Sequence, residues 1–170
     1  MGLGNKTDRQ AQKPRKWLSI HHGEVELSED GVKRTFSYVE GQLLSIYTKE
    51  RMYNGEAVLK WFIDLTDDGD LYSISFPYNS GTFKSIVLAL ASDQDLTTST
   101  AVRIEPYLKK NFTNVVVRAN GVKLDWVTKD LPPVEAVTIN GKTMKDEGKR
   151  MAYISSLVQS INSRLSRGDK

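Results

Sequence analysis

The sequence predicts a mainly β domain in which three strands, one short helix and two further strands follow one another. The predicted elements are Tyr38–Tyr47, Ala57–Leu65 and Leu71–Phe76, a helical Thr82–Ala91, then Ala101–Tyr107, Val115–Arg118 and Val122–Trp126. Turn residues separate the strands, and alternating apolar residues within them indicate one buried face. This order of elements is that of the OB-fold, a five-stranded Greek-key barrel with a short helix between strands three and four.

The first long strand and the two hairpins each carry a local signal. Gly41 lies inside the first strand, where a glycine often marks a bulge or a bend. Asn54-Gly55 is a strong hairpin signal, and Thr66–Asp70 forms a second turn before Leu71. These signals predict a bent first strand followed by a meander that ends at Pro77.

The helix and the two ends of the chain complete the predicted organisation. Phe83, Ile86, Val87 and Leu90 share one face of the short helix. Residues 1–16 are predicted to be a flexible basic arm, residues 17–130 the barrel domain, and residues 131–170 a C-terminal extension. Within this extension, Val134–Ile139 is a candidate strand and Met144–Leu165 an amphipathic helix, whose apolar face packs either on the barrel or on another subunit.

Composition favours a cytoplasmic protein. The 170 residues include no cysteine, no long apolar run and no apolar segment typical of a secretory signal, so no membrane is expected among the partners. Residues 36–129 carry ten basic and eleven acidic side chains, and the net charge of +3 comes from the two ends. Attraction of a polyanion must therefore depend on local clusters of charge.

No motif indicates an enzyme, a metal site or a cofactor. The run Asp64–Gly69 lacks the glutamate that an EF-hand needs eleven residues after Asp64, because that position is Ser75. His21 and His22 are adjacent on a predicted strand and point to opposite faces, so they do not share an ion. Neither a phosphate loop nor a G-x-S-x-G elbow is present.

Aromatic and basic residues are the remaining candidates for a site. Alternation within Ala57–Leu65 places Trp61 in the core and Phe62 on the opposite, solvent-facing side. An aromatic ring on that side suits stacking against the bases of a single strand, and lysine and arginine beside it suit its phosphates. The predicted DNA-binding residues are Lys49, Arg51, Tyr53, Lys60, Phe62, Tyr78, Arg103, Tyr107, Lys109 and Lys110.

Four segments together carry a family resemblance. These are Arg15–Ile20, Tyr38–Leu43, the strand Leu71–Pro77 followed by Tyr78, and Val102–Tyr107. In this order they resemble the OB-fold single-stranded DNA-binding proteins of bacteriophages and of Bacteroidetes-type bacteria, over about Arg15 to Lys129. The resemblance implies sequence-independent binding and protection of single-stranded DNA during replication, recombination or repair, with single-stranded DNA, a homo-oligomer or replication proteins as partners.

One departure and two alternatives accompany this resemblance. Bacterial members of the family typically end in an acidic tail that recruits partners, whereas this sequence ends in the basic Ser163–Lys170. The amphipathic helix and the nearly neutral barrel favour an alternative, a protein-interaction or structural module that uses the barrel as a scaffold. A nuclease or enzyme accessory, suggested only by the acidic turn Asp64–Asp70, ranks behind both.

Overall fold

The computed structural model describes residues 15–126 and 131–167, which form a large mixed sheet, a separate two-stranded sheet and two helices. The large sheet consists of β1 (Arg15–His21), β2 (Glu24–Glu29), β3 (Val32–Phe36), β4 (Val39–Tyr53), β5 (Glu56–Asp67), β6 (Asp70–Pro77), β7 (Ala101–Lys109), β8 (Phe112–Ala119) and β9 (Val122–Lys123). The helix α2 (Gly81–Ala91) lies between β6 and β7. The extension holds β10 (Glu135–Ile139), β11 (Lys142–Asp146) and α3 (Gly148–Arg167).

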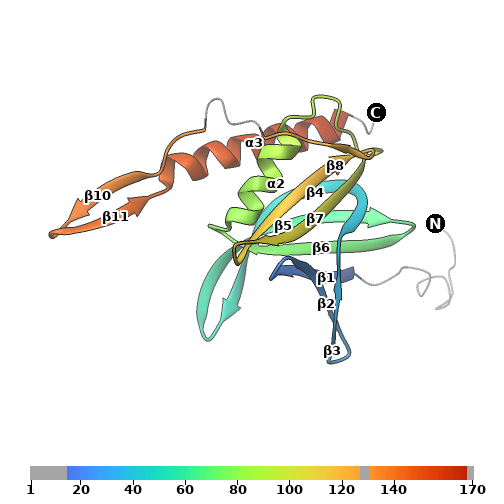
Figure 1. Ribbon diagram of the computed structural model, residues 1–170, viewed down its shortest axis with the longest axis horizontal. Helices are drawn as coiled ribbons and strands as arrows, with labels where there is room; N and C mark the ends of the chain where they lie inside the picture. The colour runs from blue at the N-terminus through green and yellow to red at the C-terminus, as the bar shows by residue number, and fades with distance from the viewer. Residues whose placement is uncertain (1–14, 127–130, 168–170) are drawn as a thin grey trace, which may run out of the picture.

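The nine strands are ordered β3-β2-β1-β6-β5-β4-β7-β8-β9 and do not close into a barrel (Figure 1). The prediction of a mainly β fold is confirmed, but the prediction of a closed five-stranded barrel is wrong. The reason is a non-local pairing, in which β1 adds to the free edge of β6 as a parallel neighbour, with Trp17 opposite Ser73. Strands β2 and β3 then extend the sheet beyond this edge.

Strand β4 links the two halves of the sheet. Its first residues, Val39–Gln42, pair with β7, and from Gln42 onward it pairs with β5, with a register shift between Leu43 and Ser45. A Cβ atom at Gly41 would lie 2.8 Å from the carbonyl oxygen of Thr66, so only glycine fits without a shift. The predicted irregularity near Gly41 therefore lies where the strand changes partners.

The core lies between this curved sheet and the two helices. Trp61 stacks on Phe83 of α2 with 4.7 Å between ring centroids, and both side chains are buried. The predicted helix is confirmed and begins after Ser80, whose Oγ accepts a hydrogen bond from the Phe83 N–H at 3.1 Å. Trp61 is thus a core residue, as its place in the alternation predicts.

The C-terminal extension differs from the sequence prediction in its first part. Residues 142–146, expected partly within a helix, form β11 and pair with β10 through the turn at Asn140 and Gly141. The helix α3 begins at Gly148 and packs against α2 and β4, where it buries Met151, Ile154, Val158, Ile161, Arg164 and Leu165. Its apolar face is therefore covered by its own chain, which settles the alternative left open by the sequence.

Two predicted segments lie largely outside the described residues. These are the basic arm, of which only Arg15 and Lys16 are described, and the basic C-terminal end beyond Arg167. Neither helix of the described ranges is long and apolar enough to cross a membrane.

Candidate functional site

The face of the sheet opposite the core carries a cluster of aromatic rings centred on Phe62. Tyr47, Phe62 and Ser75 are direct cross-strand neighbours on β4, β5 and β6. The Phe62 side chain lies outside the core cluster, as the alternation predicts, yet its residue is only 2% exposed. Tyr47 stacks on its ring at 5.5 Å, and Trp17 of β1 meets it edge-on at 6.0 Å. The prediction of an exposed Phe62 is therefore wrong, because these two neighbours cover it.

A buried carboxylate holds this cluster from below. Asp64 is 7% exposed, and its Oδ1 accepts hydrogen bonds from Ser73 Oγ at 2.6 Å and from the Tyr47 hydroxyl at 3.2 Å. Burial, and then the negative charge of Asp64, raise the pKa of Tyr47 above its usual value. These bonds fix the orientation of the Tyr47 ring under Phe62, so the aromatic cluster is preorganised.

Above the cluster lies a hollow of about 350 Å³, which we call the aromatic hollow. Its lining consists of Trp17, Arg51, Tyr53, Lys60, Phe62 and Ser75. Trp17 is 46% exposed and Tyr53 is 49% exposed, so their rings are accessible to a ligand. The structure thus brings together four of the predicted residues, Arg51, Tyr53, Lys60 and Phe62, with Trp17 as an addition.

Positive side chains are interleaved with these rings. The Arg51 guanidinium lies 5.3 Å from the ring centroids of both Trp17 and Phe62, and that of Arg15 lies 5.2 Å from the Trp17 ring. The Lys60 ammonium lies 5.7 Å from the Tyr53 ring. Such contacts are worth about 0.5–1 kcal/mol at exposed sites, so they orient the cations without fixing them.

Lys49 and Lys60 are direct cross-strand neighbours on the same face of β4 and β5. Like charges in this arrangement repel each other and destabilise a sheet. Within residues 15–126 and 131–167, no carboxylate forms an ion pair with Arg15, Lys49, Arg51 or Lys60. This face therefore combines accessible rings with four positive side chains for which the described residues supply no ion-pair partner.

Tyr78, another predicted residue, belongs to a neighbouring hollow. It is half-buried and stacks on Trp61 with 5.8 Å between ring centroids, so one face of its ring packs against the core. The second hollow, here called the hairpin hollow, measures about 510 Å³ and is lined by Tyr53, Val58, Leu59, Lys60, Pro77, Tyr78 and Asn79. Tyr53 and Lys60 line both hollows and form the wall between them.

Arg103 does not join the aromatic hollow. Its Nε donates to Glu40 Oε2 at 2.6 Å, Glu105 lies 3.7 Å away, and its guanidinium lies 4.0 Å from the Tyr38 ring. The hydrogen bond to Glu40 raises the pKa of Arg103. The carboxylates of Glu40 and Glu105 thus compensate the positive charge of Arg103, which the sequence analysis had predicted to contact DNA.

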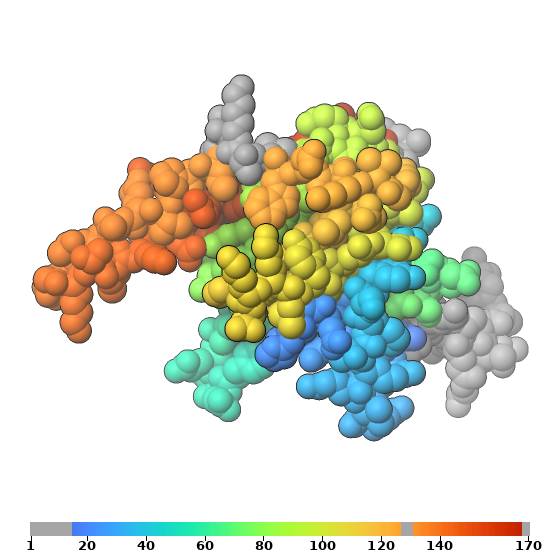
Figure 2. Space-filling view, viewed as in Figure 1, coloured from blue at the N-terminus to red at the C-terminus, as the bar shows by residue number. Residues whose placement is uncertain are grey.

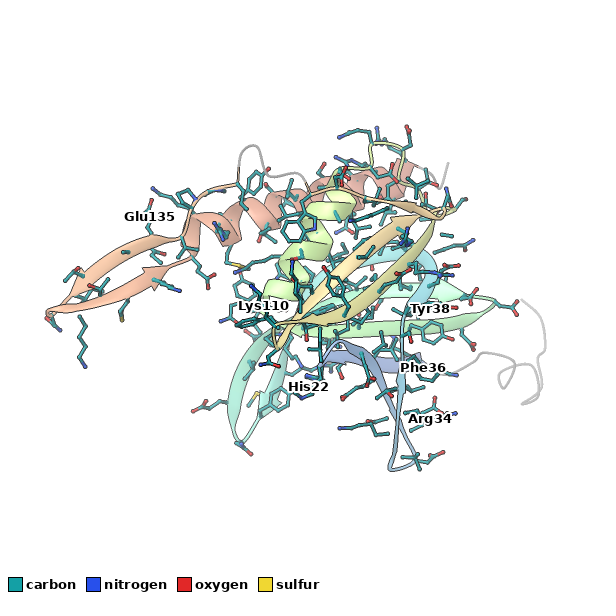
Figure 3. All side chains as sticks on the ribbon, viewed as in Figure 1. His22, Arg34, Phe36, Tyr38, Lys110 and Glu135 are labelled. Atoms are coloured by element: carbon teal, nitrogen blue, oxygen red, sulfur yellow. The ribbon has the colours of Figure 1, made fainter. Side chains whose placement is uncertain are left out.

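The last three predicted residues, Tyr107, Lys109 and Lys110, lie near the β7–β8 turn, where all three are exposed. This hairpin contacts the β1–β2 turn, since the Gly23 N–H donates to Thr113 Oγ1 at 3.1 Å. Figure 3 shows Lys110 and His22 on these two turns, on the other side of the molecule from Tyr38. The turn adds Phe112, 74% exposed, which the sequence did not single out.

A third hollow, of about 420 Å³ at another end of the sheet, is a weaker candidate for binding an anion. Lys16 and Arg34 line it, and both lie within 3.8 Å of Glu29, while its third cation is the compensated Arg103. Figure 3 shows Arg34, Phe36 and Tyr38 along this side. Among the described residues, no group of three acidic or histidine side chains is placed to hold a metal ion.

Trp17, Arg15 and Tyr47 are the important residues that sequence reasoning missed. Trp17 reaches Phe62 only because β1 pairs in parallel with β6, a contact between segments more than fifty residues apart. Tyr47 was missed although alternation along β4 and β5 places it directly opposite Phe62. Pairing residues outward from a two-residue turn at Asn54-Gly55 places Tyr47 opposite Phe62, so this contact could have been predicted from the sequence.

Comparison with known proteins gives no relative for this chain. No protein-family model matches it, and neither does any curated protein or solved structure. The site must therefore be interpreted from its own geometry.

Proposed function

We propose that the chain binds single-stranded DNA without sequence preference, through the aromatic hollow and the positive side chains around it. The observation that carries the proposal is the combination, on one sheet face, of two accessible rings and four cations without an ion-pair partner among the described residues. Bases of a single strand expose π-faces that stack on such rings, while phosphates need positive charge alongside. A duplex hides its base faces and is a poorer ligand for this surface.

Each group has a distinct role in this proposal. Trp17 and Tyr53 stack on bases, each stack being worth about 1–3 kcal/mol. Arg15, Lys49, Arg51 and Lys60 follow the phosphates, and binding relieves the repulsion between the two lysines. Phe62 packs against the Trp17 ring, and Tyr47 in turn stacks on Phe62. Lys109 and Lys110 extend the contact if the strand continues to the β7–β8 turn.

The topology of residues 39–119 supports the same proposal. Three strands, a helix and two strands follow in the order of an OB-fold, and β4 divides its pairing between β5 and β7. In that fold the face of the second and third strands and the loops after the first and fourth strands bind oligonucleotides. Here these are the faces of β5 and β6 and the turns after β4 and β7. Most of the predicted residues lie on β5 or on the ends of β4 and β7 that lead into these turns. The proposal includes protection of such strands in replication, recombination or repair, inside a bacterial cytoplasm.

The test uses the three tryptophans, which differ in exposure. Trp17 and Trp126 are about half exposed, at 46% and 50%, whereas Trp61 is 4% exposed. Poly-dT is titrated into the protein at low salt, and fluorescence anisotropy of a labelled dT oligonucleotide measures binding independently. We expect quenching in the wild type and in Trp126→Phe, and its loss in Trp17→Phe. Duplex DNA of equal length should give a far weaker anisotropy change.

Two results would overturn the proposal. The first is no change in anisotropy with the dT oligonucleotide at micromolar protein and low salt. The second is quenching that survives in Trp17→Phe and disappears in Trp126→Phe, since this result moves the interface to the segment after β9 and away from the aromatic hollow.

A further inference from the structure

The aromatic hollow and the hairpin hollow follow one another along the same face of the sheet. Phe62 and Ser75 are cross-strand neighbours on β5 and β6, and both line the aromatic hollow. The next pair on this face is Lys60 and Pro77, and both line the hairpin hollow. Alternate residues of a strand lie about 6.6–6.8 Å apart, so one short step along the sheet leads from one hollow to the other.

Tyr53 and Lys60 form the wall between the two hollows, and each of them lines both. Tyr53 is 49% exposed and lies near the end of the β4–β5 hairpin, which stands out from the body in Figures 1 and 2. The Lys60 ammonium lies 5.7 Å from the Tyr53 ring. An accessible ring and a cation thus separate two neighbouring spaces.

The far side of the hairpin hollow is a turn that carries polar groups without partners. Tyr78 and Asn79 are the central residues of this turn, which the Ser80 N–H closes by donating to the Pro77 carbonyl at 3.0 Å. Asn79 is exposed, and neither its amide nor the Tyr78 hydroxyl makes a hydrogen bond within residues 15–126 and 131–167. These groups are therefore available to a ligand.

The charge of the hairpin hollow indicates what kind of ligand fits. Among the described residues of its lining, Lys60 alone is charged, and no described carboxylate pairs with it. The carboxylates near the hairpin end, Glu50 and Glu56, line neither hollow. An apolar peptide would leave the Lys60 ammonium and the Asn79 amide unpaired, whereas a nucleotide supplies a phosphate for one and a base edge for the other.

We propose that the hairpin hollow is a second base site, which receives the nucleotide next to the one stacked on Trp17 in the aromatic hollow. The Tyr53 ring lies between the two bases, and the Lys60 ammonium contacts the phosphate that links them. The second base stacks on Tyr78 and hydrogen-bonds with the Asn79 amide. This inference rests on the proposed function and adds the direction of the strand, from β1 toward the turn before α2.

Spacing supports the insertion of a ring between two bases. Stacked bases of one strand lie about 3.4 Å apart, so a ring inserted between them separates them by about 6.8 Å. This separation matches the step of about 6.6–6.8 Å between alternate residues that leads from one hollow to the other. Tyr78 offers one ring face to the second base, because its other face stacks on Trp61.

The Asn79 amide makes the second site tolerant of base type. An asparagine side chain carries both a hydrogen-bond donor and an acceptor. The Watson–Crick edge of an unpaired base also presents both, and proteins that bind single strands hydrogen-bond to this edge. The second site therefore holds a base without selecting one, which agrees with binding without sequence preference.

Photo-crosslinking locates the two bases directly. A dT oligonucleotide with 5-iododeoxyuridine at one position is bound to the full chain and irradiated, and mass spectrometry identifies the crosslinked side chains. Because the strand binds in any register, the labelled base reaches either site. We expect crosslinks at Trp17 or Tyr53 in part of the sample and at Tyr78 in another part.

A carboxylate placed in the hairpin hollow gives a second measurement. Leu59 lines this hollow but not the aromatic hollow and is 38% exposed, so Leu59→Glu should keep the fold while it repels the strand. We expect its affinity for the dT oligonucleotide to fall by about tenfold or more, and the Tyr78 crosslink to disappear while that at Trp17 remains. Val32→Glu makes the same change of charge at an exposed position of β3 and should alter the affinity far less.

Asn79→Ala removes only the amide from the second site. Its affinity for the dT oligonucleotide should fall by about twofold to tenfold, as expected for one hydrogen bond between neutral groups. Gln94→Ala is the matched control, since it removes an exposed amide that lies outside both hollows. Melting temperatures of all variants, measured by circular dichroism, verify that each is folded.

The outcomes separate this inference from the proposed function. Unchanged oligonucleotide affinity in Leu59→Glu and Asn79→Ala, with no crosslink at Tyr78, overturns the second base site and leaves the proposed function standing. No binding of the oligonucleotide by the wild type overturns the proposed function and the inference with it. A Leu59→Glu chain that sediments differently without DNA, yet binds the oligonucleotide normally, assigns the hollow to a second copy and also overturns the inference.

Discussion

The side-chain amide of Asn162 makes two hydrogen bonds with the backbone of Ile46. Its Oδ1 accepts from the Ile46 N–H at 3.1 Å, and its Nδ2 donates to the Ile46 carbonyl at 2.8 Å. Ile46 follows the register shift in β4, beyond the last residue that pairs with β7. On this side of β4 the helix α3 thus takes the place of a neighbouring strand, through one asparagine.

Replacing Asn162 by alanine should destabilise the whole domain. The Ile46 N–H and carbonyl would lose their partners in a part-buried place, which costs about 1–3 kcal/mol in free energy of unfolding. Urea unfolding followed by circular dichroism measures this cost. Ser163→Ala, at the exposed next position of α3, is the control and should change stability by less than about 0.5 kcal/mol. Equal stability of Asn162→Ala and the wild type would show that the two bonds contribute nothing.

The structure assigns Phe62 a different role from the one that the sequence predicts. The alternation placed it correctly on the face opposite Trp61, but the face is covered at that point by Trp17, Tyr47 and Arg51. A ring that is 2% exposed supports other rings and cannot itself receive a base. Substitution at Phe62 should therefore change the stability of the fold first, and any effect on binding would follow from that change.

Phe62→Ala should lower the free energy of unfolding by about 3–5 kcal/mol, because it opens a cavity among packed rings. Phe112→Ala is the matched control, since the same atoms are removed from a side chain that is 74% exposed. Its effect should stay within about 0.5 kcal/mol. Thermal unfolding of the two variants side by side makes the comparison. Similar melting temperatures for both variants would mean that Phe62 is not packed as described.

The elements that sequence predicted well are those with local signals. Asn54 and Gly55 have positive φ values at the hairpin turn that the sequence predicts, and Asn120 and Gly121 have positive φ values at the turn between β8 and β9. The buried face of α2 could also be predicted, since its apolar residues recur with helical spacing. Sequence spacing suffices where a contact is formed within one hairpin or one helix.

The elements that sequence missed depend on distant partners. Nothing near Trp17 indicates that β1 pairs in parallel with β6, and this pairing adds strands that an OB barrel lacks. Met144 fits the helical spacing of the residues after it, yet the Asn140-Gly141 turn draws it into β11 opposite Val137. Trp17 and Arg15 join the candidate site only through the first of these contacts, which is why the sequence named Phe62 without Trp17.

The Lys49–Lys60 pair should affect binding and stability in opposite directions. If both ammonium groups contact phosphates, removing each should reduce the slope of log affinity against log salt by about 0.7. The free protein should keep its stability or gain slightly, because two like charges no longer face each other. Salt titrations with dT oligonucleotides and urea unfolding are compared for Lys49→Ala, Lys60→Ala and the double variant.

Lys33→Ala provides the control for this comparison. Lys33 lies on β3 with its side chain 63% exposed and 3.8 Å from Glu26, away from the aromatic hollow. Its removal should leave the salt slope unchanged. An equal loss of slope for Lys33→Ala and for Lys60→Ala would indicate attraction by overall charge instead of contact at this face.

The ion pair between Lys84 and Glu147 predicts how acid affects the attachment of α3 and the β10–β11 hairpin to α2. The hydrogen bond from Lys84 lowers the pKa of Glu147 below its usual value. A lowered pKa in the folded state gives stability that is present above the unfolded pKa, near 4.3, and is lost as pH falls through the folded value. Glu147→Gln should therefore be less stable than the wild type near neutral pH, by less than about 1 kcal/mol for a partly exposed pair. Urea unfolding at about pH 7 and about pH 3 should show this difference shrinking in acid, as the wild-type carboxylate takes up its proton. A difference of the same size at both pH values would mean that the glutamine acts through packing and that the charge of Glu147 does not stabilise the fold.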